Sequence, residues 1–223
     1  MTNVTLDTNC IIDLEENTPA ALYIWKLVHR FESRKINLRV VAISASERKP
    51  DGTYASNFAE FKEKIAALGL KGVDILKPIA YCGVTFVDWC LVADDQMLEL
   101  ERKIHQILFP EVEFSYDEFC RKRGLDSISR QIDRRWCNAK CDVLALWSHI
   151  WYGSGIFVTG DNNFHKQTKK PELIALGAGE ILRPEEAAAR LTCGVALLST
   201  KLQKWFVEIF LEWLKSLLKR ARL

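Results

Sequence analysis

The sequence predicts an α/β protein in which a parallel sheet carries helices on both faces. Apolar segments with strand character alternate along the chain with segments whose apolar residues recur at helical spacing. The chain has 223 residues, of which 48% are hydrophobic, enough for a sizeable core in one domain or in a domain with an appendage. Acidic residues also follow three of the expected strands, so parallel pairing would bring them to one edge of the sheet.

Residues 3–14 join the first strand to the first helix through Asp7. Val4 to Leu6 favour a strand, whereas Asp7, Thr8 and Asn9 are residues that cap the start of a helix. Taken alone, Asp7 is most simply an N-cap. Ligands of open α/β sheets bind just beyond the carboxyl ends of strands, so Asp7 is also a candidate for chemistry.

The middle of the chain adds further alternating elements. Periodicity predicts helices over 19–32, 57–68 and 97–108 and a strand over 38–43, with Glu47 just past its end. Residues 75–92 are rich in strand-forming and aromatic residues, but Pro78 and Gly83 interrupt them.

The stretch that follows, residues 111–140, is polar and basic. Its positive side chains are Arg121, Lys122, Arg123, Arg130, Arg134, Arg135 and Lys140. The acids in its second half are only Asp126 and Asp133. A solvated helical face and a phosphate-binding surface are equally good interpretations of this run.

The last third of the chain contains two more acids at positions of interest. A helix is predicted over 141–151, with Asp142 in its first turn, and a strand over 156–159 leads into Asp161. A short strand over 179–182 and a helix starting at Pro184 follow. Residues 202–223 are predicted to form an amphipathic helix that packs on its own domain or on a second copy or partner protein, with binding to a membrane surface as a weaker alternative.

The composition indicates a cellular compartment and argues against a membrane-spanning helix. The chain has seven cysteines, an odd number, and no secretory signal, so we expect free thiols in the reducing cytoplasm. Cys137 and Cys141 could begin a zinc site, but two buried thiols are the better expectation because no further ligands have suitable spacing. The chain has no run of 18 uncharged apolar residues, so we expect no membrane-spanning helix.

Several carboxylates would therefore meet at one edge of the sheet. Asp7, Glu47 and Asp161 follow strand ends, and Asp142 joins them if its helix begins at the rim. Crowded carboxylates repel one another unless a cation neutralises them, and oxygen ligands favour Mg²⁺ or Mn²⁺. Such ions activate water for attack on a phosphodiester, so this chemistry needs no histidine or serine nucleophile.

These residues resemble the PIN-domain ribonucleases, a family that includes the VapC-type toxins of bacterial toxin–antitoxin pairs. The matching positions are Leu6-Asp7-Thr8-Asn9, Glu47, Asp142 and residues 158–164. The resemblance implies a three-layer α/β/α sandwich and cleavage of RNA that depends on Mg²⁺ or Mn²⁺. Residues 1–191 would form the PIN-like domain, with an insertion around 70–140, and residues 192–223 a C-terminal amphipathic helical extension.

The resemblance also assigns roles to individual residues. The catalytic acids would be Asp7, Glu47, Asp142 and Asp161, with Asp7, Asp142 and Asp161 holding the metal. Glu60 and Glu63 are alternatives to Glu47. Asn9 and Thr159 would orient Asp7, and Asn163 would support the same cluster. RNA contacts are expected from Arg130, Arg134, Arg135, His165 and Lys166, with Lys169 and Lys170 beside them, and an antitoxin-like protein could bind the C-terminal helix.

Two other functions remain open at this point. A non-catalytic PIN-like binding module would need only the loss of one acid. A haloacid-dehalogenase-type phosphatase also begins with a strand and an Asp, but it requires an acid two residues later, where this chain has Asn9. It also requires an acid about four residues after Asp161, where this chain has His165.

Overall fold

The computed structural model describes residues 1–43, 57–127 and 132–192. Compactness divides the chain into two units, Met1–Ala188 and Ala189–Leu223. Glu47, Arg130 and the helix expected over 202–223 lie outside the described residues, so these predictions stay predictions.

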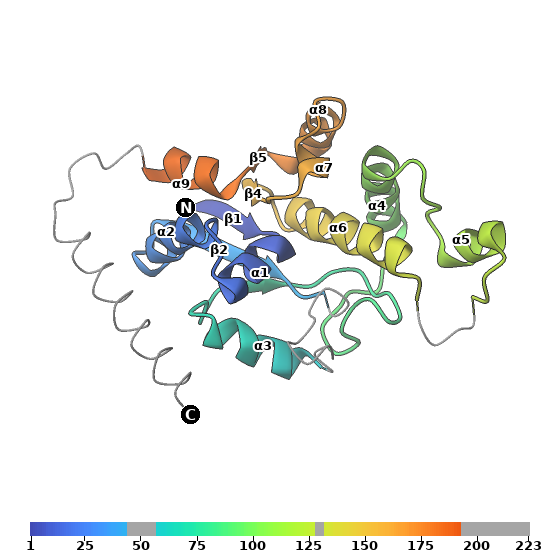
Figure 1. Cartoon of the computed structure of the whole chain (residues 1–223), viewed down its shortest axis with the longest axis horizontal. Helices are drawn as coiled ribbons and strands as arrows, with labels where there is room; N and C mark the ends of the chain where they lie inside the picture. The colour runs from blue at the N-terminus through green and yellow to red at the C-terminus, as the bar shows by residue number, and fades with distance from the viewer. Residues whose placement is uncertain (44–56, 128–131, 193–223) are drawn as a thin grey trace. The chain divides into compact units, whose positions relative to one another are not determined.

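The described strands form one parallel sheet (Figure 1). They are β1 (Thr2–Leu6), β2 (Ile36–Val41), β3 (Asp74–Leu76), β4 (Ile156–Val158) and β5 (Glu180–Leu182). Their order is β3-β2-β1-β4-β5, and Leu6 pairs with Val40 on one side and Val158 on the other. The strand order therefore reverses between β1 and β4, and ligands of doubly wound sheets bind at such a switch point.

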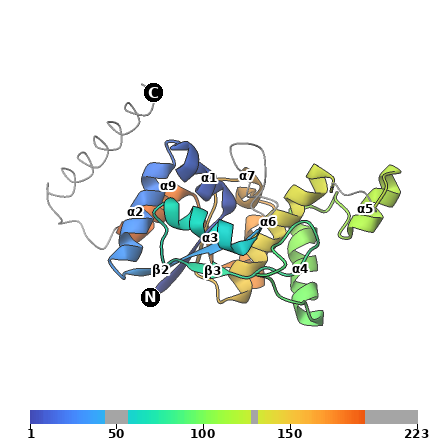
Figure 2. The same cartoon turned by 90° about the horizontal axis from the view of Figure 1, so that it is seen from below.

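Helices follow the strands and cover the sheet. They are α1 (Thr8–Glu16), α2 (Ala21–Glu32), α3 (Phe58–Ala67), α4 (Asp95–Leu108), α5 (Tyr116–Arg123), α6 (Arg134–Trp151), α7 (Asn162–His165), α8 (Lys170–Leu173) and α9 (Pro184–Thr192). Helices α1 to α3 lie on one side of the sheet and α4 and α6 on the other (Figures 1 and 2), as right-handed crossovers require. The predicted α/β class with a parallel sheet is confirmed. None of the described helices has the length and apolarity to cross a membrane.

Two predicted elements differ from the structure. The segment 75–92 contributes only the end of β3 and an isolated bridge between Ile79 and Leu91. Helix α6 begins at Arg134, capped by Asp133, and not at Cys141. Its early turns bury Trp136 and Ala139 on one face while the outer face is polar, so the sequence looked like a solvated basic stretch.

Lys140 is buried inside the protein and is not part of a basic surface, so that expectation was wrong. Its Nζ lies 2.6 Å from Oε1 of Glu101 on α4, and both side chains are inaccessible to solvent. The rings of Tyr81, Phe114 and Trp136 surround the ammonium group. Burial lowers the pKa of Lys140, while Glu101 opposes the shift. The ion pair therefore fixes α6 against α4 in the core.

His149 is buried under the sheet, with both ring nitrogens engaged. Nδ1 lies 2.8 Å from Oγ1 of Thr5, and Nε2 lies 2.9 Å from the carbonyl oxygen of Ala178. Burial lowers the pKa of His149 to about 4, and the charge of Arg39 adds to the shift. The imidazole is therefore neutral and structural at physiological pH.

We predict that Lys140→Met lowers the free energy of unfolding by about 3–5 kcal/mol, because Glu101 would be left as an uncompensated buried charge. Urea denaturation measures this loss. Combining it with Glu101→Leu should recover most of the stability. The matched control is Lys103→Met, which breaks the exposed pair with Glu99 and should cost below about 0.5 kcal/mol. Equal effects of the two lysine variants would contradict the prediction.

We also predict that the contribution of His149 to stability falls as the pH decreases from 6.5 towards 4. In this window the unfolded chain protonates His149 and the folded protein does not, so this proton uptake favours unfolding. Asp7 acts with the opposite sign, because burial raises its pKa to about 6 and the folded protein therefore takes up its proton first. The contribution of His149 is at most about 3 kcal/mol. In denaturation series at several pH values, the slope of the unfolding free energy against pH should be less positive for His149→Gln than for the wild type, and an unchanged slope would refute the assignment.

Candidate metal and nucleic-acid site

Asp7 lies at the switch point, held by residues of α1 and of the end of β4. It follows β1 directly, and its backbone N–H donates to the carbonyl oxygen of Val158 on β4. Oδ1 accepts a hydrogen bond from the N–H of Thr8, so Asp7 caps α1. Oδ2 accepts from Asn9 Nδ2 and Thr159 Oγ1, each at 2.7 Å. The N-cap and the candidate site residue are thus the same side chain.

The hydroxyl of Thr159 joins Asp7 to the loop that carries Asp161. While it donates to Asp7, it accepts from Asn9 Nδ2 at 2.9 Å and from the N–H of Asp161 at 3.1 Å. The N–H of Gly160 donates to Oδ1 of Asn9. Segments 150 residues apart in the sequence are therefore fixed in one hydrogen-bonded unit.

Asp142 faces the same region from α6. Burial raises its pKa well above the usual range, and the charges of Asp7 and Asp161 raise it further. Burial likewise raises the pKa of Asp7 to about 6, with Asp161 adding to the shift. The three carboxylates therefore lie close enough to repel one another. Within the described ranges, no Lys or Arg forms an ion pair with any of them.

The acids are near one another but do not form a closed ligand set. In the part of the chain that the structure describes, no three His, Cys, Asp or Glu side chains are positioned to share a metal ion. The alternatives to Glu47 lie on α3, where Glu60 exchanges hydrogen bonds with the helix cap Asn57 and Glu63 is exposed. Neither contributes to the pKa shift of Asp7 or Asp142.

The loop after Asp161 is tied to its surroundings by several contacts. Asn163 donates its backbone N–H to Asp161 Oδ1, but its side chain points to the carbonyl oxygen of Leu108 and to Lys169. His165 Nε2 lies 2.9 Å from the carbonyl oxygen of Thr159, and Lys166 is exposed. Asn163 thus supports the cluster through its backbone, whereas Lys169 caps the end of α4.

Arg183 is a further site residue, which the sequence analysis missed. It follows β5, and its guanidinium donates to the carbonyl oxygen of Gly160 and to Oδ1 of Asn162. These bonds hold both sides of Asp161 in place. The sequence feature that could have indicated Arg183 is its position as a cation directly after a strand that ends at the same edge of the sheet.

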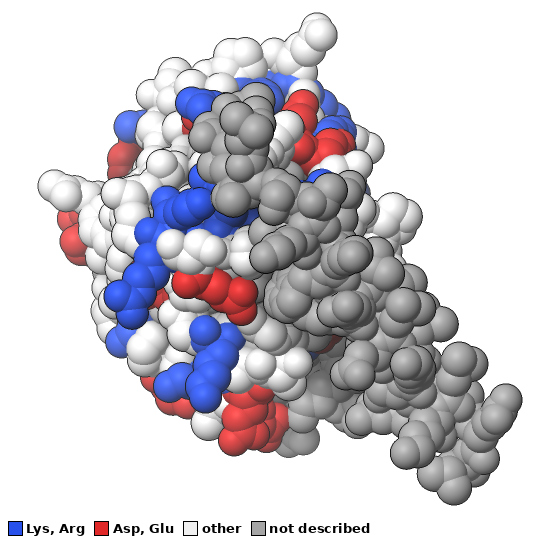
Figure 3. All heavy atoms as spheres, turned by 90° about the vertical axis from the view of Figure 1, so that its left-hand side faces the viewer, with Lys and Arg blue, Asp and Glu red and all other residues white. Residues whose placement is uncertain are grey.

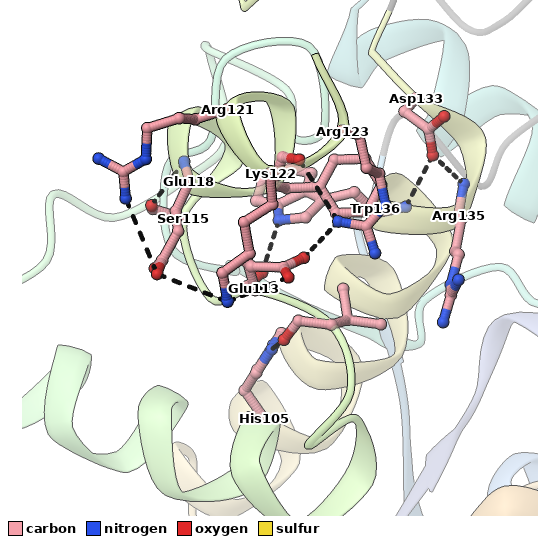
Figure 4. A network of polar contacts seen from close by, with 12 residues as sticks. His105, Glu113, Ser115, Glu118, Arg121, Lys122, Arg123, Asp133, Arg135 and Trp136 are labelled. Atoms are coloured by element: carbon pink, nitrogen blue, oxygen red, sulfur yellow. Dashed lines mark hydrogen bonds and ion pairs between the residues drawn. The ribbon is translucent and has the colours of Figure 1, made fainter. Parts of the chain in front are cut away.

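The cations on α5 are largely paired with glutamates (Figure 4). Arg123 lies 2.5 Å from Glu113, Lys122 contacts Glu113 and Glu118, and Arg121 contacts Glu118. Hydrogen bonds from Arg123 and Lys122 lower the pKa of Glu113 to about 2. The α5 part of the basic run is therefore locally neutralised.

Arg134 and Arg135, at the start of α6, are exposed to solvent. The face that bears α2 and α9 also carries Lys and Arg side chains. There, however, the cations gather in small clusters beside Asp and Glu (Figure 3). The start of α6 is thus the better candidate for phosphate contacts.

Cys137 and Cys141 share a hydrogen bond on α6 and have no further ligands in place among the described residues. All cysteines that the structure describes are free thiols.

The chain matches no family model, no curated protein and no solved structure. Its function must therefore be inferred from its own residues and their geometry.

We predict that Thr159→Val lowers the free energy of unfolding by about 1–3 kcal/mol, because the hydroxyl makes three hydrogen bonds in a buried place. Thr159→Ser keeps the hydroxyl and should retain most of the stability. Thermal or urea denaturation of both variants tests this, and equal losses would show that the methyl group matters and the hydroxyl does not.

Proposed function

We propose that the protein is a ribonuclease that depends on Mg²⁺ or Mn²⁺ and resembles the PIN-domain enzymes. The supporting observation is the convergence of Asp7, Asp142 and Asp161 at the carboxyl edge of the sheet. They come from three distant segments and lack an ion-pair partner in the described chain. Such a cluster of negative charge is a binding site for a cation.

The side chains present fit a hard divalent cation. Asp7, Asp142 and Asp161 offer carboxylate oxygens, the donors that Mg²⁺ and Mn²⁺ prefer. When bound, the ion supplies an activated water and charge stabilisation for the phosphate. Asn9 and Thr159 hold one oxygen of Asp7 in a fixed orientation. Cation binding would offset the repulsion between these acids, which raises the pKa values of Asp7 and Asp142.

The proposed reaction consumes one water molecule and breaks one P–O bond of the RNA backbone. One fragment gains a phosphate monoester and the other a hydroxyl group. The phosphates on either side of the cleaved bond would meet cations such as Arg135 and Lys166, which are exposed. Glu47 as a further acid, Arg130 as an RNA contact and an antitoxin-like partner at 202–223 belong to the same proposal.

A second candidate is a PIN-like module that binds RNA without cleaving it. Loss of one acid would be enough for this alternative, and Glu47, the fourth expected acid, lies outside the described residues. The phosphatase alternative is weaker, because the position of its general acid holds Asn9, whose amide is bound to Asp7 and Thr159.

We predict that the full-length protein cleaves labelled RNA in Mn²⁺ and that EDTA stops the reaction. Asp7→Asn, Asp142→Asn and Asp161→Asn should each reduce kcat at least about a hundredfold, because each removes a negative charge from the cation site. Gel analysis of the fragments measures the rates.

The control is Asp117→Asn on α5, which makes the same change at an exposed position. It should leave cleavage unchanged. RNA binding without cleavage that depends on these acids would support the binding module instead.

A further inference from the structure

Helix α6 presents a line of polar side chains that leads to the acid cluster. Arg135 and Asn138 are exposed and Asp142 is half-buried. At about 100° per residue, Arg135 lies about 20° and Asn138 about 40° from Asp142 around the helix axis. At about 1.5 Å per residue, they lie about 10.5 Å and 6 Å from it along the axis. We call these residues the α6 stripe.

The opposite face of the same turns is buried and held from several sides. Lys140 pairs with Glu101, and Trp136 Nε1 donates to the carbonyl oxygen of Glu113 at 3.0 Å (Figure 4). The N–H of Asp133 donates to the hydroxyl of Tyr116. These contacts fix the rotation of α6, so the stripe stays exposed and Asp142 keeps facing the acids.

The stripe also has unused hydrogen-bonding groups. Within the described ranges, neither the guanidinium of Arg135 nor the amide of Asn138 contacts another protein group in a hydrogen bond or ion pair. The cations of neighbouring α5 are paired with Glu113 and Glu118. A free guanidinium is a strong ligand for phosphate, and an amide can bind phosphate or ribose hydroxyl groups.

We propose that the α6 stripe binds one strand of RNA on one side of the cleaved bond. Arg135 contacts a phosphate about three stacked nucleotides from the acids, given about 3.4 Å per nucleotide. Asn138 contacts the backbone between them. A single line of contacts along a helix fits single-stranded RNA, because a duplex is bound across a groove with contacts to both strands. This inference rests on the proposed ribonuclease function.

The matched variants are Arg135→Ala and Arg121→Ala. Both remove an exposed arginine, but Arg121 lies on α5 and its guanidinium is paired with Glu118. With single-stranded RNA and Mn²⁺, Arg135→Ala should raise KM about tenfold with kcat retained. The slope of log affinity against log salt should fall by about 0.7 in this variant, the value for one phosphate of a single strand. Asn138→Ala should raise KM less and leave the salt dependence unchanged. Arg121→Ala should behave like the wild type.

Substrates with one neutral methylphosphonate locate the contact. Neutralising the phosphate that Arg135 binds should weaken wild-type binding and have no effect on Arg135→Ala. Equal effects of the two arginine variants on KM, or a methylphosphonate effect that persists in Arg135→Ala, would overturn the stripe while acid-dependent cleavage still stands. An equal KM effect on duplex RNA would overturn the single-strand assignment. Loss of all acid-dependent cleavage would overturn the ribonuclease proposal and the stripe together.

Discussion

The hydroxyl of Thr159 links the two strand ends on which the candidate site depends. It donates to Asp7 after β1 and accepts the N–H of Asp161 after β4. The adjacency of β1 and β4 in the sheet makes this contact possible, because their carboxyl ends meet where the strand order reverses. Hydrogen bonds to Asp7 favour its charged form, but burial outweighs them and leaves its pKa at about 6. The fold therefore holds the Asp7 carboxylate in a place that disfavours its charged form, and the hydrogen bonds from Thr8, Asn9 and Thr159 only partly offset this effect.

The region between β3 and α6 gives the third acid its position. Asp142 is on a helix that starts at Arg134, about two turns before the start at residue 141 that the sequence predicts. The buried pair of Lys140 and Glu101 anchors those turns against α4, two residues before Asp142 in the sequence. Removing water from such a pair is costly, so its value here is orientation more than net stability. The contacts of α4 with α6 thus determine which face of α6 meets solvent and which carboxylate faces Asp7.

The sequence was sufficient for the elements whose pattern is local. The spacing of apolar residues predicted α2, α3 and α4 nearly in full, and Asp7 was predicted as a cap from its neighbours alone. The start of α6 was missed because its buried face includes a lysine, and a buried lysine cannot be distinguished from a solvated one without knowing its partner on α4. Arg183 was missed because its partners are a backbone carbonyl and an asparagine, which no charge pattern reveals.

The cations nearest to the acids strengthen the case for a bound metal ion. The charge of Asp161 opposes the lowering of the Lys169 pKa by burial. The ammonium group of Lys169 nevertheless donates to the carbonyl oxygen of Leu108 and to the side chain of Asn163. Arg183 donates to the backbone carbonyl of Gly160 and to the side chain of Asn162, on either side of Asp161, and the structure gives it no ion pair with that carboxylate. Both cations therefore shape the loop without neutralising the acid. A site selected only for stability would pair these charges, because unpaired neighbouring carboxylates oppose folding. The proposed divalent-cation site needs carboxylates without cationic partners, and in the part of the chain that the structure describes Lys169 and Arg183 bind other groups.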